Sequence, residues 1–190
     1  MKLRLLPLTC FIFLLAMLQG CKVWQAPTYQ TITWNQAFSL EIPDYLQAVD
    51  TLKEERRLNP DGIFQYENQE RDLFLILRRD SLASLHLRQP DFDLKDFYDV
   101  TIEHLVNSLT GASAPPPDSM GINAMPAYVG DLSGILEGDM LFYRLALAEG
   151  REYVYQILVW TTEEKRPMYE EDMNRLLFSF KENPGLLMTE

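Results

Sequence analysis

Two strand-like segments that are apolar on both faces most constrain how this chain can fold. The first, Leu73–Arg78, begins with five apolar residues in a row, and the second, Glu152–Trp160, is apolar or aromatic at nearly every position. A strand with one face in water alternates apolar and polar side chains, so strands without that alternation are covered on both sides. The chain therefore predicts a sheet that lies between two other layers.

Further segments with strand character complete the predicted sheet. Turn signals such as Asn59-Pro60-Asp61-Gly62 separate them, and short connections favour antiparallel pairing of neighbours. The triple proline at 115–117 predicts a stiff connector that cannot join a sheet interior. The additional strands are expected at 29–34, 37–42, 63–66, 122–129, 134–137 and 140–148.

The segment 93–110 carries the clearest helical pattern. Asp93 stands at a natural N-cap position, and Gly111 stands where a glycine often follows a helix. We expect Leu105 to be a core residue, so that Leu105→Asp would unfold the domain. The apolar stripe consists of Leu94, Phe97, Tyr98, Thr101, Ile102, Leu105 and Leu109.

A second helix is predicted at 167–180, where Pro167 occupies a favoured first-turn position. Its apolar stripe consists of Tyr169, Met173, Leu176, Leu177 and Phe180. Two amphipathic helices and a doubly covered sheet predict an α+β fold, an α/β/α sandwich around a mostly antiparallel sheet.

The order of these elements resembles the Mog1/PsbP-like fold, in particular its lipidated bacterial versions. The resemblance rests on an early strand closed by proline (Phe38–Pro43), a hairpin (Phe64–Arg78), a middle helix, a long hairpin around Gly150–Tyr155, and a last helix ending Ser179-Phe180-Lys181. It spans residues 37–181. For function, the resemblance implies an accessory module that meets a protein partner, and the photosynthetic role of the plant members does not transfer.

The chain opens with Met1-Lys2-Leu3-Arg4 and continues without charge to Leu18, which is the order of an export signal. This stretch is too short for a membrane-spanning helix. It ends in Leu18-Gln19-Gly20-Cys21, which resembles the lipobox of bacterial lipoproteins. The alternative is an ordinary signal with an incidental cysteine, although an Ala-x-Ala-like end is absent. We therefore expect residues 1–20 to be removed as a signal peptide.

By this resemblance Cys21 is the lipidation site and carries the acyl chains that hold the protein to the bilayer. Cys10 leaves with the signal, so disulfides and cysteine-based catalysis are excluded. Residues 21–28 form a short tether, in which Trp24 is placed to reach the membrane interface. Lys22 favours the outer membrane, with the domain facing the periplasm or the cell surface.

The mature chain is strongly acidic. Without Lys2 and Arg4, 15 of the 17 basic residues remain against 28 acidic ones, a charge of about −13. Such a charge repels phosphate backbones, so nucleic acid is excluded as a partner. About 170 residues suffice for one domain, expected at 29–181 with a loose tail at 182–190.

Residues that could carry catalysis are scattered. His86 and His104 lack metal-ligand spacing, and Gly130-Asp131-Leu132-Ser133-Gly134 has its serine one place late for a nucleophile elbow, as in a simple turn. Carboxylate pairs can hydrolyse glycosides or bind calcium, but these acids follow no such pattern: Glu67, Glu70, Asp72, Glu163, Glu164, Glu170, Glu171 and Asp172.

No catalytic framework, metal site or cofactor motif is therefore predicted. The sequence favours a non-catalytic binding or assembly module of the bacterial envelope, anchored by Cys21 and acting on a protein partner. Two alternatives remain open: a small envelope hydrolase with a carboxylate or histidine site, and a carrier of a small apolar ligand. A surplus of aromatic residues would suit a ligand-binding sheet face, namely Trp24, Trp34, Tyr128, Tyr143, Tyr153, Tyr155 and Trp160.

Overall fold

A computed structural model describes residues 26–50 and 58–183. Its centre is an eight-stranded sheet in which every pairing is antiparallel. In spatial order the strands are β3 (Gln47–Ala48), β4 (Phe64–Asn68), β5 (Leu73–Ser81), β10 (Tyr153–Thr162), β9 (Asp139–Glu149), β8 (Met125–Leu136) and β6 (Thr110–Ser113), and β7 (Asp118–Ile122) also pairs with β8.

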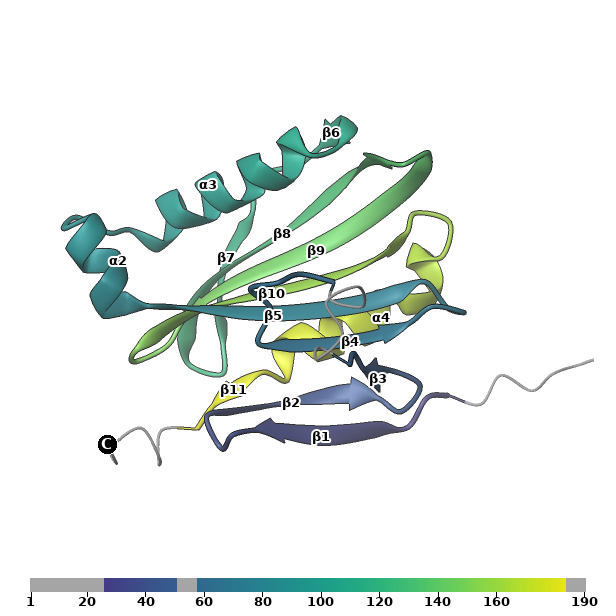
Figure 1. The fold of residues 1–190 in the computed structure, drawn as a ribbon, viewed down its shortest axis with the longest axis horizontal. Helices are drawn as coiled ribbons and strands as arrows, with labels where there is room; N and C mark the ends of the chain where they lie inside the picture. Colours follow the sequence, from purple (N-terminus) through teal and green to yellow (C-terminus); the bar gives the residue numbers. More distant parts are fainter. Residues whose placement is uncertain (1–25, 51–57, 184–190) are drawn as a thin grey trace, which may run out of the picture.

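Layers cover both faces of this sheet (Figure 1). Helix α3 (Leu94–Asn107) lies over one face, with the short α2 (Leu82–Arg88) at its end. The other face carries α4 (Arg166–Phe178) and a small sheet formed by β1 (Tyr29–Trp34), β2 (Phe38–Pro43) and β11 (Lys181–Glu182). The predicted α+β sandwich with an antiparallel sheet is confirmed, and one of its two layers is part sheet.

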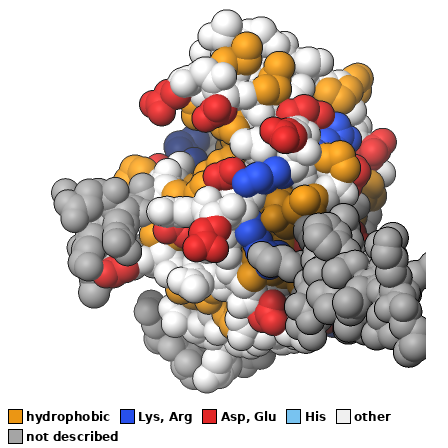
Figure 2. All heavy atoms as spheres, turned by 90° about the vertical axis from the view of Figure 1, so that its right-hand side faces the viewer, with side chains coloured by type: hydrophobic (Ala, Val, Ile, Leu, Met, Phe, Trp, Pro, Cys, Tyr) orange, Lys and Arg blue, Asp and Glu red, His pale blue; other side chains and the backbone are white. Residues whose placement is uncertain are grey.

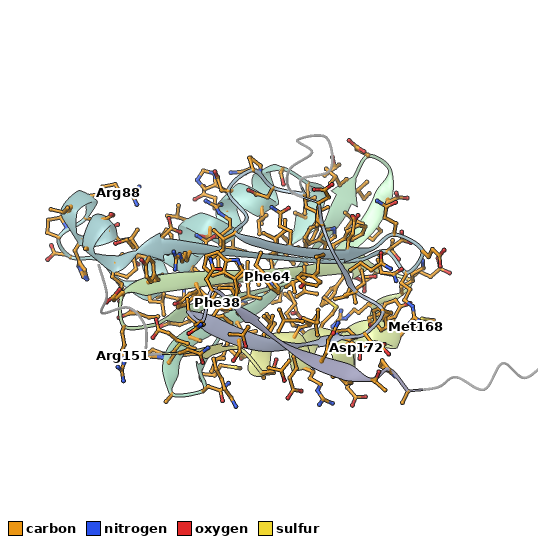
Figure 3. All side chains as sticks on the ribbon, turned by 60° about the horizontal axis from the view of Figure 1, so that its bottom comes forward. Phe38, Phe64, Arg88, Arg151, Met168 and Asp172 are labelled. Carbon is orange, nitrogen blue, oxygen red and sulfur yellow. The ribbon has the colours of Figure 1, made fainter. Side chains whose placement is uncertain are left out.

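The main core lies between the large sheet and the α4 layer. Every residue of the predicted α4 stripe is buried, and Met173, Leu176, Leu177 and Phe180 are fully enclosed. The side chains of Phe38 and Phe64 meet edge to face in this layer (Figure 3). Apolar burial on this scale is the main contribution to the stability of such a fold.

A buried carboxylate joins α4 to the β1–β2 layer. Asp172 accepts hydrogen bonds from the hydroxyl groups of Tyr29 and Tyr45. Burial, followed by these hydrogen bonds to Asp172, raises the pKa of both phenols above the ordinary tyrosine value. Both tyrosines are therefore neutral donors, which is the form that a buried carboxylate requires of its partners.

Two local predictions were wrong, and one short helix was missed. Residues 125–136 form one continuous strand, β8, so the Gly130–Gly134 motif is not a turn. Gly111 does not cap the helix, because α3 ends at Asn107 with Ser108 as its C-cap and Gly111 lies in β6. Helix α2 was not predicted, because seven residues are too few to establish a helical period.

Candidate functional site

The face of the sheet beneath α3 presents apolar rows that run across three strands. Ile76 of β5, Leu158 of β10 and Leu145 of β9 are register partners and form one row. The neighbouring row consists of the rings of Phe74, Trp160 and Tyr143, whose centroids are 5.1 and 6.0 Å apart and nearly parallel. Alternation along each strand places these side chains on a single face.

Helix α3 covers only part of this face. It packs on β6, β8 and β9, and only Leu94 and Tyr98 of its residues are buried. A cleft of about 730 Å³ lies between α3 and the β5–β10 part of the sheet. Its lining comprises Asn59, Ile76, Arg78, Asp80, Leu85, Arg88, Gln89, Asp96, Phe97, Val100, Thr101, His104, Leu105, Leu145, Gln156 and Leu158.

The position of α3 is set by two glycines of β8. A Cβ on Gly130 would overlap the hydroxyl oxygen of Tyr98, and a Cβ on Gly134 would lie 2.9 Å from Cβ of Leu109. Both positions therefore admit close approach from the α3 segment because they lack a side chain. The Gly130–Gly134 motif thus has a packing role, which its sequence spacing did not reveal.

Tyr98 ends in an unusual environment. Its hydroxyl group is buried and has no hydrogen-bond partner among the described residues. Burial, with smaller effects from the charges of Asp131 and Asp99, raises the pKa of Tyr98 to about 12. The ring fixes the N-terminal half of α3 on the sheet, beside the cleft.

The rim of the cleft carries charges of both signs. Gln156 donates a hydrogen bond to Asp80 at 2.7 Å, and Arg78 lies 3.5 Å from Asp61. Arg88 donates to the carbonyl oxygen of Ser84 at 3.3 Å. The cleft therefore combines an apolar floor with polar groups at its edge, an arrangement typical of ligand sites.

The two histidines are not brought together by a shared acid. His104 lines the cleft from α3, whereas His86 on α2 packs edge to face against the ring of Phe92, with centroids 5.5 Å apart. Neither imidazole forms a hydrogen bond with another described residue. Histidine catalysis commonly uses an imidazole that is oriented by a carboxylate. Neither His86 nor His104 has such a partner among the described residues.

Three of the acidic residues singled out in the sequence, Asp72, Glu163 and Glu170, form ion pairs. Asp72 lies 2.6 Å from Lys165, and Glu170 lies 3.3 Å from Arg144, which also binds Asp131 through two hydrogen bonds of 2.7 and 2.8 Å. These bonds to Asp131 raise the pKa of Arg144 above its ordinary value. Among the described residues, no cluster of histidine, cysteine or acidic side chains could hold a metal ion.

Two predictions on the helical segment need separate comment. Leu105 is only partly buried and lines the cleft, so its placement in a closed core was wrong. Its neighbours on the stripe, Phe97 and Ile102, are also partly exposed. The stripe is wider than the surface that α3 buries, and three of its other members, Phe97, Thr101 and Leu105, line the cleft.

The predicted lipidation site, Cys21, and Trp24 lie outside the described residues. Within residues 26–50 and 58–183, no helix has the length and apolar character needed to cross a bilayer. Of the other predicted aromatic residues, Trp34 stacks on Phe38 with centroids 5.3 Å apart, and Tyr155 is buried in the main core.

Comparison with solved structures identifies the architecture. The chain resembles the solution structure of cyanobacterial PsbP (CyanoP) from Synechocystis, with a TM-score of 0.57 and 12% identity over 86% of this chain and 97% of that one. It also resembles the yeast Ran-binding protein Mog1p, with a TM-score of 0.54 and 12% identity over 82% and 96%. The chain has the Mog1/PsbP-like fold.

A third Mog1/PsbP-like neighbour is LpqN of Mycobacterium tuberculosis, described as involved in cell envelope biogenesis. Its TM-score is 0.56, at 8% identity over 84% of this chain and 93% of LpqN. No protein-family model and no curated protein sequence matches the chain. At such identities the likeness concerns the fold, and function has to be argued from the site.

Proposed function

We propose that this chain is a lipid-anchored, non-catalytic module of the bacterial cell envelope that binds a segment of a partner protein in the α3 cleft. The observation that carries the proposal is the cleft itself, an apolar sheet surface left open beside a helix that turns apolar side chains towards it. Soluble domains rarely leave a large apolar surface exposed, and where one is exposed it commonly marks a binding site.

The shape of the cleft favours an elongated apolar segment. Its floor is one aliphatic row, Ile76, Leu158 and Leu145, and Val100 of α3 stands at its side with 51% of its surface exposed. The mixed charges of Arg78, Asp80 and the other rim residues suit a peptide, whose polar groups of both signs they can orient. Buried apolar anchors with a polar rim are the usual anatomy of protein interfaces.

The envelope location rests on the lipobox-like Leu18-Gln19-Gly20-Cys21. Two or more acyl chains on Cys21 give stable attachment to a bilayer, which a single chain does not. Lys22 after the cysteine favours the outer membrane. The description of LpqN, a protein of the same fold, as involved in cell envelope biogenesis agrees with this compartment.

The absence of catalysis is inferred from how the candidate groups are used. Asp72, Glu163 and Glu170, near the start of α4, are paired with Lys165, Arg166 and Arg144. Asp172 accepts hydrogen bonds from two tyrosines, and the two histidines do not share an orienting acid. Such groups stabilise the fold or the surface and have no free partner for proton transfer.

A carrier of a small apolar ligand is the second candidate function. The volume of about 730 Å³ falls within the range of small-molecule sites, roughly 300–1,000 Å³. Native mass spectrometry of the protein released from membranes separates the two candidates, because a carrier retains a small adduct. A protein-binding module is isolated without one.

The test of the main proposal compares variants in cells that lack the native protein. Val100→Asp places a charge in the cleft, whereas Phe178→Asp changes another exposed apolar residue, which lies in α4 on the other face of the sheet. We expect Val100→Asp to lose function while it stays folded and Phe178→Asp to retain it. The proposal also predicts a crosslink to one envelope protein from a photoreactive residue at position 101, abolished by Val100→Asp.

A third variant, His86→Ala/His104→Gln, addresses the enzyme alternative. It removes both imidazoles but keeps a polar side chain at the cleft rim. We expect this variant to complement fully. Loss of function in a folded, membrane-bound His86→Ala/His104→Gln protein that still forms the crosslink from position 101 would refute the non-catalytic reading.

A further inference from the structure

Exposed apolar side chains gather at the end of the molecule opposite α2. Ile135, Leu136 and Met140 stand at the tip of the β8–β9 hairpin with 38%, 41% and 47% of their surface exposed, and Met168 of α4 is 47% exposed. Ile135 and Met140 are register partners. Figure 2 looks onto this end, where several hydrophobic side chains are exposed at the top, among acidic side chains.

Hydrogen bonds connect the hairpin tip to the start of α4. The backbone N–H of Glu163 donates to the carbonyl oxygen of Met140 at 2.9 Å, just before the helix begins. Met168 then lies one turn before Asp172, which binds the hydroxyl group of Tyr29. The exposed apolar residues are thus linked through α4 to β1, the first strand that the structure describes.

The described part of the chain begins at this same end. In Figure 1 strand β1 begins on the side of the β8–β9 tip, and in Figure 3 Met168 and Asp172 lie towards the end at which β1 begins, with Arg88 at the far end. Only five Cα–Cα steps separate Cys21 from Ala26, the first described residue, with four residues between the two. Fully extended, they reach roughly 18 Å.

We propose that this end is a membrane-docking face, on which the β8–β9 tip and Met168 rest against the bilayer that holds Cys21. The inference rests on the proposed acylation of Cys21, because the short tether then keeps this end within reach of the lipid. Apolar side chains at such a position gain free energy by entering the interfacial region.

The charges of the tip define the lipid surface that it suits. Glu137 and Asp139 flank the turn between Leu136 and Met140. These carboxylates remain at the level of the head groups and are repelled by anionic lipid. The docking face therefore fits a zwitterionic bilayer, with shallow contact and the carboxylates in water. The strands β8 and β9 then run away from the membrane, and the α3 cleft opens sideways towards envelope proteins.

The exposed methionines provide a direct test. The chain from Cys21 onwards contains a single cysteine, which can be coupled to a maleimide-bearing lipid in phosphatidylcholine vesicles. Coupling replaces cellular acylation, so the outcome is independent of whether the cell lipidates Cys21. Hydrogen peroxide converts accessible methionine to the sulfoxide, and mass spectrometry of peptides gives the rate at each site.

We expect oxidation of Met140 and Met168 to slow about fivefold or more on vesicles relative to the uncoupled protein. Met120 in β7, which is partly exposed, should keep its rate. The variant Ile135→Ser/Leu136→Ser should lose most of the protection at Met140, whereas the matched Phe178→Ser should not. Unchanged rates at Met140 and Met168 would overturn the proposal, as would protection that survives removal of the apolar tip.

Discussion

Gly130→Ala tests whether the lack of a side chain at position 130 of β8 is what allows Tyr98 of α3 to pack so closely. The added Cβ would overlap the hydroxyl oxygen of Tyr98 and lie 3.2 Å from its Cζ. Tyr98 is 1% exposed and is one of only two buried residues of α3. Because the ring is enclosed, we expect the added Cβ to lift the helix from the sheet or to bend the strand.

Overpacking of this kind costs about 1–3 kcal/mol of unfolding free energy. Tyr98→Phe removes the atom that would overlap, and also a buried hydroxyl group without a partner, so alone it should be neutral or slightly stabilising. In the double variant the alanine still faces Cζ at 3.2 Å, so relief is incomplete. We expect a coupling free energy of about 1–2 kcal/mol in favour of the double variant.

Urea unfolding of the four proteins, followed by circular dichroism, measures this cycle. Gly121→Ala in β7 is the matched control, because its Cβ would meet nothing nearer than a carbonyl oxygen at 3.8 Å. Alanine there should be neutral or stabilising by up to about 1 kcal/mol. The reasoning is refuted if Gly130→Ala costs the same with tyrosine and with phenylalanine at position 98.

Three further outcomes are expected. The pKa of Tyr98 is raised to about 12 in the fold and is about 10 in an unfolded chain. The contribution of the neutral tyrosine to stability is therefore complete below a pH of about 10 and is lost as the pH rises towards 12. Phenolate absorbance and urea unfolding midpoints measured across that pH range check this. Leu177→Asp, in the closed core, should cost several kcal/mol and unfold the domain, whereas Leu105→Asp at the open cleft should cost far less, as thermal denaturation of the two variants will show. Cys21→Ser should abolish labelling by radioactive palmitate in growing cells, and continued labelling would exclude lipidation at that residue.

The sandwich could be predicted because the composition of its central strands shows that both of their faces are covered. Leu73–Arg78 and Glu152–Trp160 are apolar on both faces, and the structure places β5 and β10 side by side with a layer on each face. The small sheet could not be assigned to a separate layer, because its third strand, β11, consists of only two residues and is defined by pairing with β2 across more than a hundred residues. Contacts so distant in sequence leave no local pattern.

The lining of the cleft was only partly accessible from the sequence. His104, Leu105 and Phe97 were noted as members of one helix, but their partners Ile76 and Leu158 lie in strands whose faces the pattern treats as equivalent. Which face of a doubly apolar strand receives the larger layer depends on the register of the whole sheet. The packing role of Gly130 was missed for the same reason.

The two long helices carry stripes of similar composition, yet their burial differs. The α4 stripe is enclosed throughout, whereas α3 buries only Leu94 and Tyr98 fully and leaves Val100 half exposed. A helix whose apolar stripe served only stability could pack the whole stripe against the sheet. Helix α3 instead packs closely over β8, where Gly130 and Gly134 leave room for it, and so lies to one side of the sheet. The uncovered β5–β10 surface is therefore a consequence of where α3 is held, so a substitution that moves α3, such as Gly130→Ala, should change ligand binding as well as stability.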